Sequence, residues 1–284
     1  MITLPVDAAE IEYSDRGAGT PVVLVHAGVF SDWFLPVSES RVLDDAFRVV
    51  RVRRAGYAGR EPSRHLTMAD HAGHLASLAD HLGLDGACWV GHSSGCQIVL
   101  QLALDRPDLV RTLILIEPAA GGGFAVPAAE ALGRRFIGPA MASFAAGDVP
   151  AAFDIFMRGV CGDGFRTVLE QRLGASGVEL AVRQSSFFIR DEVPAVIEST
   201  FSAADAARIL CPVLVAEGAN GAAEGPLSRQ ITARAVELLP HAEVVRVAGT
   251  NHMMPLQDPE AVARMIRDFA TRHDSPHAGQ VETR

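Results

Sequence analysis

Short runs of apolar, β-branched residues alternate with longer stretches of helical spacing along most of the chain. Strands are predicted where such runs are bounded by glycine, proline or polar turns, at residues 22–25, 47–52, 87–90, 111–116, 212–216 and 243–247. Helices are predicted from apolar positions spaced three to four residues apart, at residues 67–82, 96–104, 228–239 and 259–272. Because strands that alternate with helices form βαβ units, the pattern predicts an α/β fold, with a mostly parallel central sheet and flanking helices.

The pattern changes between residues 119 and 208, where Ala, Gly, Phe and Arg recur with helical spacing and without a clear strand. We expect this segment to be a helical lid, inserted into one core domain that comprises residues 1–118 and 209–273. Residues 274–284 have the composition of a flexible polar tail. With 284 residues, of which 49% are hydrophobic, the chain can bury the single large core that this organisation requires.

Composition and charge disfavour several classes of protein. The formal net charge is −9 and no block of Lys or Arg stands out, so a nucleic-acid partner is not expected. The first residues lack the basic start and apolar centre of a signal peptide, and no apolar run reaches membrane-spanning length. The four cysteines, Cys88, Cys96, Cys161 and Cys211, show no C-x-x-C spacing. Three of the four lie in apolar runs typical of buried thiols. These features predict a cytoplasmic protein and leave a homodimer open.

The pentapeptide Gly91-His92-Ser93-Ser94-Gly95 lies between a predicted strand and a predicted helix. A G-x-S-x-G pattern in this context is typical of a nucleophile elbow, a strained turn that exposes the serine oxygen. Glycines two residues to either side of Ser93 remove side chains that would collide in such a turn. A glycine-rich turn with an incidental serine is the alternative interpretation. We favour the nucleophile because the strand and the helix are both in place.

A serine hydroxyl needs a base near neutral pH, and histidine has the suitable pKa. His252 is favoured among the ten histidines because it follows the last predicted strand, at the sheet edge where sites gather in such folds. A histidine that caps the loop is the alternative. We interpret His26 and His92 as turn or packing residues. His71 and His74 are one helical turn apart, which is compatible with metal ligation, but without a third ligand we expect a solvated helix face.

The third member should be a carboxylate that orients the imidazole. Most proteins with this elbow have an aspartate after the strand that follows the lid, but residues 217–224 contain none. Glu117 ends the strand after the elbow helix, where a charge would be costly in the core but useful at the edge of the sheet. We favour Glu117, with Glu224 second, because chain order allows either. A carboxylate that only caps a loop amide is the alternative for Glu117.

Acyl chemistry also needs hydrogen-bond donors for the oxyanion of the tetrahedral intermediate. The backbone amide of Ser94 is predicted to be one, because it begins the helix after the elbow. The amide of Gly28, at the end of the strand that leads through Val25, is predicted to be the other. An ordinary glycine turn is the alternative for Gly28.

Together these positions resemble the α/β-hydrolase superfamily over most of the chain, the lid excepted. The resemblance rests on His26-Ala27-Gly28, the elbow, Asp105-Arg106-Pro107 after the elbow helix, and His252 followed by Asp258-Pro259. Within the superfamily the chain is similar to lactone hydrolases of the zearalenone-opening type, at five site positions: Gly28, Ser93, Ser94, Gly95 and Glu117.

This second similarity implies that Glu117 is the acid, since Gly218-Ala219 here also lacks a following aspartate. It further implies an ester or lactone substrate. One feature departs from the lactonase pattern, in which a lid tryptophan lies against the substrate. Trp33 and Trp89 both lie outside the predicted lid.

The leading hypothesis is a serine hydrolase that needs no cofactor or metal and cleaves a small apolar ester or lactone. Six phenylalanines of the predicted lid favour an apolar substrate, although most can be lid core: Phe144, Phe153, Phe156, Phe165, Phe187 and Phe188. A non-hydrolytic receptor of the same fold is a second hypothesis, but it has no need of Ser93 and His252. Acyl transfer, carbon–carbon bond hydrolysis or cofactor-free oxygenation form a third. A dehalogenase or epoxide hydrolase is disfavoured, because both need a carboxylate in place of Ser93.

Overall fold

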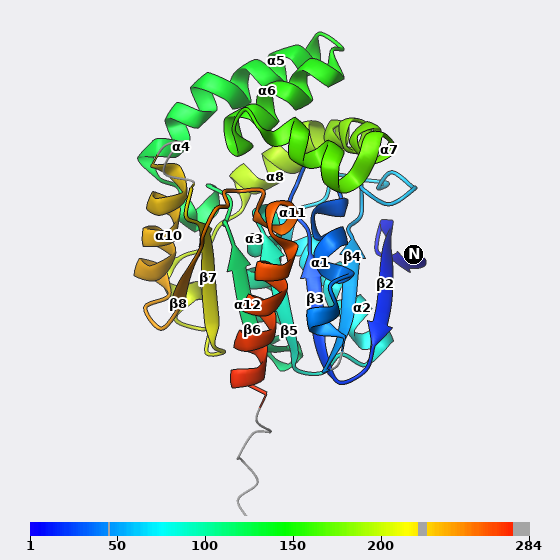
Figure 1. Ribbon diagram of the computed structural model, residues 1–284, viewed down its shortest axis with the longest axis vertical. Coiled ribbons are helices and arrows are strands. Elements are labelled where there is room, and N and C mark those ends of the chain that lie inside the picture. The colour runs from blue at the N-terminus through cyan, green and yellow to red at the C-terminus, as the bar shows by residue number, and fades with distance from the viewer. Residues whose placement is uncertain (45, 221–225, 275–284) are drawn as a thin grey trace, which may run out of the picture.

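The computed structural model describes residues 1–44, 46–220 and 226–274. Within them, eight strands form one sheet in the order β1-β2-β4-β3-β5-β6-β7-β8 (Figure 1). The strands are β1 (Ile2–Val6), β2 (Ala9–Gly17), β3 (Thr20–Val25), β4 (Phe47–Arg53), β5 (Ala87–His92), β6 (Val110–Ile116), β7 (Val213–Gly218) and β8 (Glu243–Val247). β1 and β2 pair antiparallel and β2 meets β4 antiparallel, whereas all pairs from β4 to β8 are parallel. The prediction of a mostly parallel sheet is therefore confirmed.

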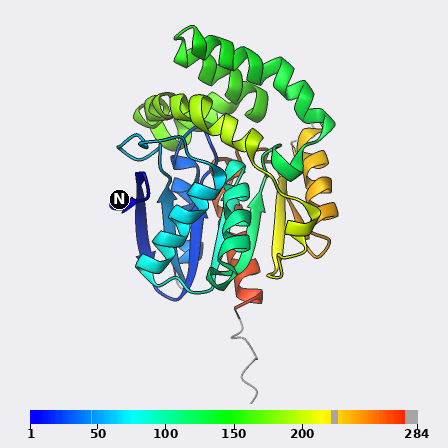
Figure 2. The ribbon, with the colours of Figure 1, turned by 180° about the vertical axis from the view of Figure 1, so that it is seen from behind.

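Helices cover both faces of the sheet, as Figures 1 and 2 show from opposite sides. One face carries α2 (Met68–Leu82), α3 (Ser94–Asp105) and α10 (Leu227–Leu238), and the other carries α1 (Leu35–Ser38) and α12 (Pro259–Arg272). Because side chains alternate along a strand, each central strand contributes side chains to the core on both faces of the sheet. In β3, Val23 and Val25 pack towards α2 and α3, and Val22 and Leu24 pack towards α1 and α12.

A layer of helices lies across the carboxyl ends of the parallel strands, at the top of Figure 1. It is formed by the segment between β6 and β7, all of which is described and which contains helices but no strand. We use "helical layer" for α4 (Pro127–Leu132), α5 (Gly138–Ala145), α6 (Val149–Cys161), α7 (Phe165–Phe187), α8 (Val193–Glu198) and the π-helical turn Phe188–Glu192; a short α9 (Ala203–Ala206) leads to β7. An apolar cluster joins the layer to the core, where Trp33 and Tyr57 meet side chains of α6 and α7.

Most predicted elements are present, with ends that differ by a few residues. The first two strands were not predicted, although β2 places Ile11 and Tyr13 in the core between more exposed neighbours. The division into a core and a lid at residues 118 and 209 stays a prediction. The tail predicted at 274–284 lies outside the described residues, except for Asp274.

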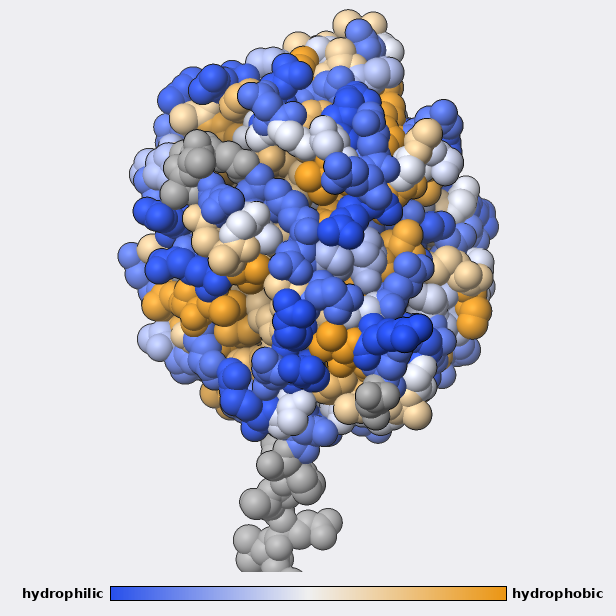
Figure 3. All heavy atoms as spheres, in the orientation of Figure 1, coloured by the Kyte–Doolittle hydropathy of each residue, from blue (hydrophilic) through white to orange (hydrophobic). Residues whose placement is uncertain are grey.

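The remaining predictions about the chain as a whole concern cysteines and membranes. Cys88, Cys96 and Cys161 are buried, as expected of thiols in apolar runs. Within the described residues, no helix has the length and apolar character needed to cross a bilayer. The face shown in Figure 3 is largely hydrophilic, with apolar patches between the polar side chains.

Candidate active site

The elbow is a strained turn between β5 and α3. Ser93 lies between the last residue of β5 and the first of α3, with φ +54° and ψ −118°. This left-handed region is costly for a residue with a side chain and persists only where the surroundings enforce it. Both flanking glycines are needed, since a Cβ on Gly91 would lie 2.6 Å from the Gly95 carbonyl oxygen and one on Gly95 would lie 2.5 Å from that of Val25. The predicted strand–turn–helix geometry is present.

A pocket opens beside Ser93, between the sheet edge and the helical layer. Its wall contains every described residue that was predicted to act in catalysis: Gly28, Ser93, Ser94, Glu117 and His252. The cavity measures about 160 Å³. Its remaining lining is mainly apolar and includes Trp33 from the core side and Phe156 and Phe188 from the helical layer.

His252 lies on the loop between β8 and α11 (Met254–Gln257), and its side chain is 14% exposed. Its Nδ1 lies 3.5 Å from Oε2 of Glu117. The Nε2–H of His92 donates to the backbone carbonyl of His252 (3.0 Å), which ties the loop to the elbow. In the described part of the chain, Ser93 and His252 do not share a hydrogen bond. Such catalytic contacts are often long in substrate-free sites and tighten when substrate binds.

Glu117 follows the last residue of β6 with φ +45° and is 6% exposed. Its Oε1 accepts hydrogen bonds from the backbone N–H of Gly218 (2.6 Å) and from the hydroxyl of Ser228 (2.8 Å). These donors compensate the burial of a carboxylate and leave Oε2 to face His252. Glu117 thus lies beside the histidine, and it also caps a loop amide. Its role as the acid stays a prediction.

Other carboxylates near the sheet edge do not meet His252 in the described residues. Glu217 is buried at the end of β7, but it pairs with Arg246. Glu224, the second choice for the acid, lies outside the described residues.

The two predicted oxyanion donors meet at the pocket from different elements. Ser94 begins α3, whose exposed amides and dipole favour negative charge. Gly28 follows β3, and a Cβ at this position would overlap the ring of Phe188, so the close approach of the helical layer requires glycine. The carbonyl of Gly28 accepts from the Nε1–H of Trp33 (2.8 Å) and the N–H of Phe30 (2.9 Å), which fixes this turn.

A buried polar cluster lies behind these two positions and was not predicted from the sequence. Glu192, on the helical layer, is 1% exposed and contacts Arg54, Tyr57 and Ser94. No local signal marks Glu192, because its partners are 98 to 138 residues away in the chain. Trp33 was named in the sequence, but its place in the pocket wall was not foreseen.

The buried histidines outside the pocket serve the packing. Burial holds the pKa of His26 and of His92 well below the usual value; nearby Arg54 adds to the effect for His26, and His252 for His92. Both are fully buried, which agrees with their interpretation as turn or packing residues.

The prediction that His71 and His74 form a solvated helix face is wrong. They are 2% and 3% exposed, because the face of α2 that carries them packs on the protein rather than pointing to water. His74 Nε2 contacts the backbone carbonyl of Asp7 (2.9 Å). Among the residues that the structure describes, no three His, Cys, Asp or Glu side chains gather in a way that could hold a metal ion.

Of the six phenylalanines predicted in the lid, Phe156 and Phe188 line the pocket. Phe153, Phe165 and Phe187 are buried in the cluster that joins the layer to the core, and Phe144 packs against it. Four of the six are thus packing residues away from the pocket, and two form part of its wall.

Comparison with known proteins gives sequence relatives and structural neighbours. The chain is 31% identical over 143 residues to the dihydrolipoyllysine-residue acetyltransferase component of the acetoin cleaving system of Cupriavidus necator, covering 47% of this chain and 37% of that protein. It is 34% identical over 101 residues to the putative carbamate hydrolase RutD of Enterobacter cloacae, covering 34% of this chain and 38% of the relative. The chain thus matches well under half the length of these curated relatives.

Solved structures match over almost the whole chain. The enol-lactonase of Burkholderia xenovorans has a TM-score of 0.76 at 19% identity, over 95% of this chain and 100% of that one. A thermophilic esterase of Thermogutta terrifontis has a TM-score of 0.73 at 23% identity, over 96% and 99% of the two chains. At these identities the likeness shows the shared fold. The sequence profile of the Alpha/beta hydrolase family matches residues 22–265, and the chain belongs to this family.

Proposed function

We propose that this chain is a serine hydrolase that cleaves a small apolar carboxylic ester or lactone through an acyl-enzyme. One observation carries the proposal. Ser93, held on a strained turn, lines the same pocket as His252, whose Nδ1 faces the buried carboxylate of Glu117. A binding protein would gain nothing from a nucleophile, a base and an orienting acid placed in one wall.

In the proposed reaction, Ser93 Oγ attacks the substrate carbonyl carbon while Nε2 of His252 takes the hydroxyl proton. Glu117 holds the ring through Nδ1 and stabilises the imidazolium that forms. The backbone amides of Gly28 and Ser94 donate to the oxyanion. His252 then gives its proton to the leaving oxygen, and water, activated by the same imidazole, releases the acid. Each step uses side chains of this chain alone, and we propose no cofactor.

The pocket supports a compact apolar substrate. A cavity of about 160 Å³ can hold a group about as large as a benzene ring. Trp33, Phe156 and Phe188 offer it an aromatic wall. The esterase and enol-lactonase activities named for two structural neighbours guide the choice of ester and lactone. A macrocyclic lactone, as the zearalenone-type similarity implies, is larger than this cavity and would extend beyond it.

Purified protein should be assayed with p-nitrophenyl acetate, butyrate, benzoate and octanoate, and with small and macrocyclic lactones. We expect turnover of small apolar members and its loss in Ser93→Ala. Ser199→Ala is the matched control, because Ser199 lies outside the pocket and donates to the backbone carbonyl of Val196 (2.7 Å). Ser93→Ala protein that retains the rate of the control would overturn the proposed function.

A further inference from the structure

Glu192 stands out because it is a buried carboxylate of the helical layer that reaches into the core behind the elbow. Its Oε1 accepts from the Ser94 hydroxyl (2.5 Å) and from Nη2 of Arg54 (2.8 Å), and its Oε2 accepts from the Tyr57 hydroxyl. The side chains of Arg54 and Glu192 are 1% and 0% exposed. Three donors on one carboxylate, one of them charged, form a site built from elements far apart in the sequence.

The cluster touches the supports of both predicted oxyanion donors. On one side, Glu192 holds the side chain of Ser94, whose amide begins α3. On the other, a Cβ built on Gly28 would lie 3.3 Å from Oε1 of Glu192.

The negative charge of Glu192 would disfavour an oxyanion at this site unless an opposite charge compensated it. A lone carboxylate directly behind Gly28 and Ser94 would repel negative charge on the substrate oxygen, and the low dielectric of a buried site would strengthen the repulsion. Arg54 supplies the opposite charge. It makes one hydrogen bond to Glu192 and lies over the Tyr57 ring at 5.0 Å, so its main partner is the carboxylate itself.

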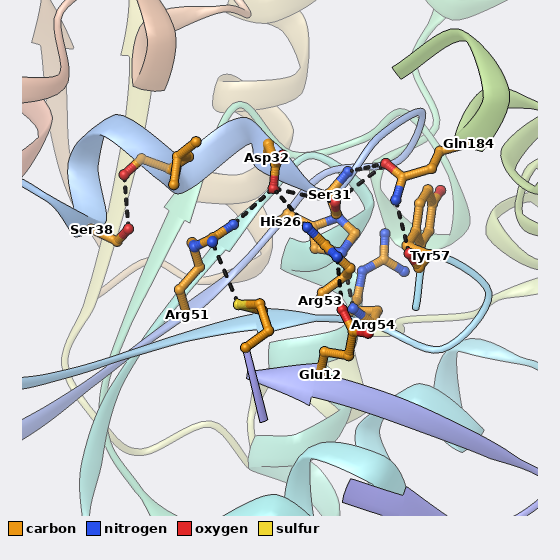
Figure 4. Close-up of polar contacts among 12 residues, drawn as sticks. Glu12, His26, Ser31, Asp32, Ser38, Arg51, Arg53, Arg54, Tyr57 and Gln184 are labelled. Carbon is orange, nitrogen blue, oxygen red and sulfur yellow. Dashed lines mark hydrogen bonds and ion pairs between the residues drawn. The ribbon is translucent and has the colours of Figure 1, made fainter. Parts of the chain in front are cut away.

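Neighbouring contacts keep the loop that bears Arg54 and Tyr57 against the helical layer. Figure 4 shows Gln184 of α7 beside Ser31 and Tyr57. Its side-chain Nε2 donates to the carbonyl of Tyr57 (2.8 Å), and its Oε1 accepts from the N–H of Ser31 (2.9 Å). The backbone N–H of Arg54 donates to Nε2 of His26 (3.1 Å). A buried ion pair usually adds little net stability, because both charges lose their hydration. The burial of Arg54 and Glu192 therefore points to a role in the site rather than in stability.

We propose that Glu192 is a positioning residue that fixes Ser94 and the Gly28 turn from the helical layer, and that Arg54 neutralises it so that the oxyanion site stays favourable for negative charge. This inference rests on the proposed function. It adds that the helical layer takes part in aligning the oxyanion donors as well as in enclosing the substrate.

The test is a double-mutant cycle of Arg54→Met and Glu192→Gln, with kcat and KM measured on the best p-nitrophenyl ester. Arg54→Met leaves the carboxylate uncompensated, so we expect kcat to fall at least about tenfold with a smaller change in KM. This fall in kcat should be smaller than the fall caused by removing a whole oxyanion donor. Adding Glu192→Gln removes the charge and keeps an acceptor for Ser94, so kcat should rise at least about fivefold above that of Arg54→Met alone. If the two substitutions act only by disturbing the structure, without charge coupling, the kcat of the double variant should instead not exceed that of Arg54→Met.

Glu198→Gln is the matched control, because Glu198 ends α8 in the same layer with a side chain that is 66% exposed. It should keep the wild-type kcat. If Arg54→Met does not fold, the double variant still decides, because removal of a whole buried pair is often tolerated. A folded double variant should then exceed Glu192→Leu in kcat, since leucine gives Ser94 no acceptor.

The inference is overturned if the double variant is no faster than Arg54→Met, or no faster than Glu192→Leu where the single arginine variant is unfolded. Failure of the proposed function looks different. In that case Ser93→Ala matches wild type, whatever the cycle shows.

Discussion

Replacing Glu117 by Gln removes one negative charge and almost no volume from the site. The amide can still accept from Gly218 N–H and Ser228 Oγ, so the fold should persist. What is lost is the attraction between the carboxylate and the imidazolium that forms when His252 takes the proton. At the 3.5 Å between His252 Nδ1 and Glu117 Oε2, and with an effective dielectric constant of about 20, this attraction is roughly 4–5 kcal/mol. A barrier higher by that amount lowers kcat by roughly a thousandfold.

The assay is steady-state hydrolysis of the best ester by wild type, Glu117→Gln, Glu217→Gln and Glu224→Gln, with thermal unfolding measured in parallel. Glu217 is the matched control, since it is 2% exposed on the neighbouring strand but pairs with Arg246. The control and the Glu224 variant should stay within a few-fold of wild type. Glu117→Gln protein that is folded and keeps more than about a tenth of wild-type kcat would refute the electrostatic argument. A thousandfold loss in Glu224→Gln instead would give the acid role to Glu224.

Three further outcomes follow from the structure. Gly28→Ala places a Cβ in the Phe188 ring, so kcat/KM should fall and the free energy of unfolding should decrease by about 1–3 kcal/mol; unchanged values would contradict the close approach. Burial lowers the pKa of His26, His71 and His92 in the folded state, so the unfolded chain takes up their protons first as pH falls. The stability that comes from keeping them neutral is therefore present above about pH 6.5 and is lost below it, by up to about 1.4 kcal/mol for each histidine at pH 5.5. Urea unfolding at pH 7.5 and 5.5 measures this loss, and equal free energies of unfolding at the two pH values would contradict the prediction. Ser228→Ala removes a donor to Glu117 and should lower kcat several-fold without a change in KM, whereas an unaltered kcat would show that the donor is dispensable.

Much of the fold could be predicted because its local and global signals agree. The parallel strands are buried on both faces and read as continuous apolar runs, as in β5 and β7. The edge strands differ. β1 is mostly exposed, and the alternation in β2 is carried by few residues, so neither run was recognised. The helix face with His71 and His74 was predicted to be solvated because histidine is a polar residue. Its neighbour Leu75 is buried in the core under α2, and this apolar neighbour was the better guide.

The site residues also differ in how far the local sequence marks them. Ser93 and Gly28 lie in short motifs whose strained or crowded backbone demands particular residues, so the sequence alone marks them. Glu117 could be placed at a strand end, but its distance from His252 depends on the packing of β6 beside β7 and on the loop after β8. Glu192 has no motif, and its role arises only where the helical layer meets the core.

The central claim is that Ser93 carries the acyl group, and covalent labelling tests it most directly. Wild type and Ser93→Ala would each be treated with a fluorophosphonate and measured by intact-mass spectrometry, and the modified peptide would then be sequenced. We predict one adduct per wild-type chain, mapped to Ser93, and none on the variant. Equal labelling of both proteins, or an adduct on another residue, would contradict the account.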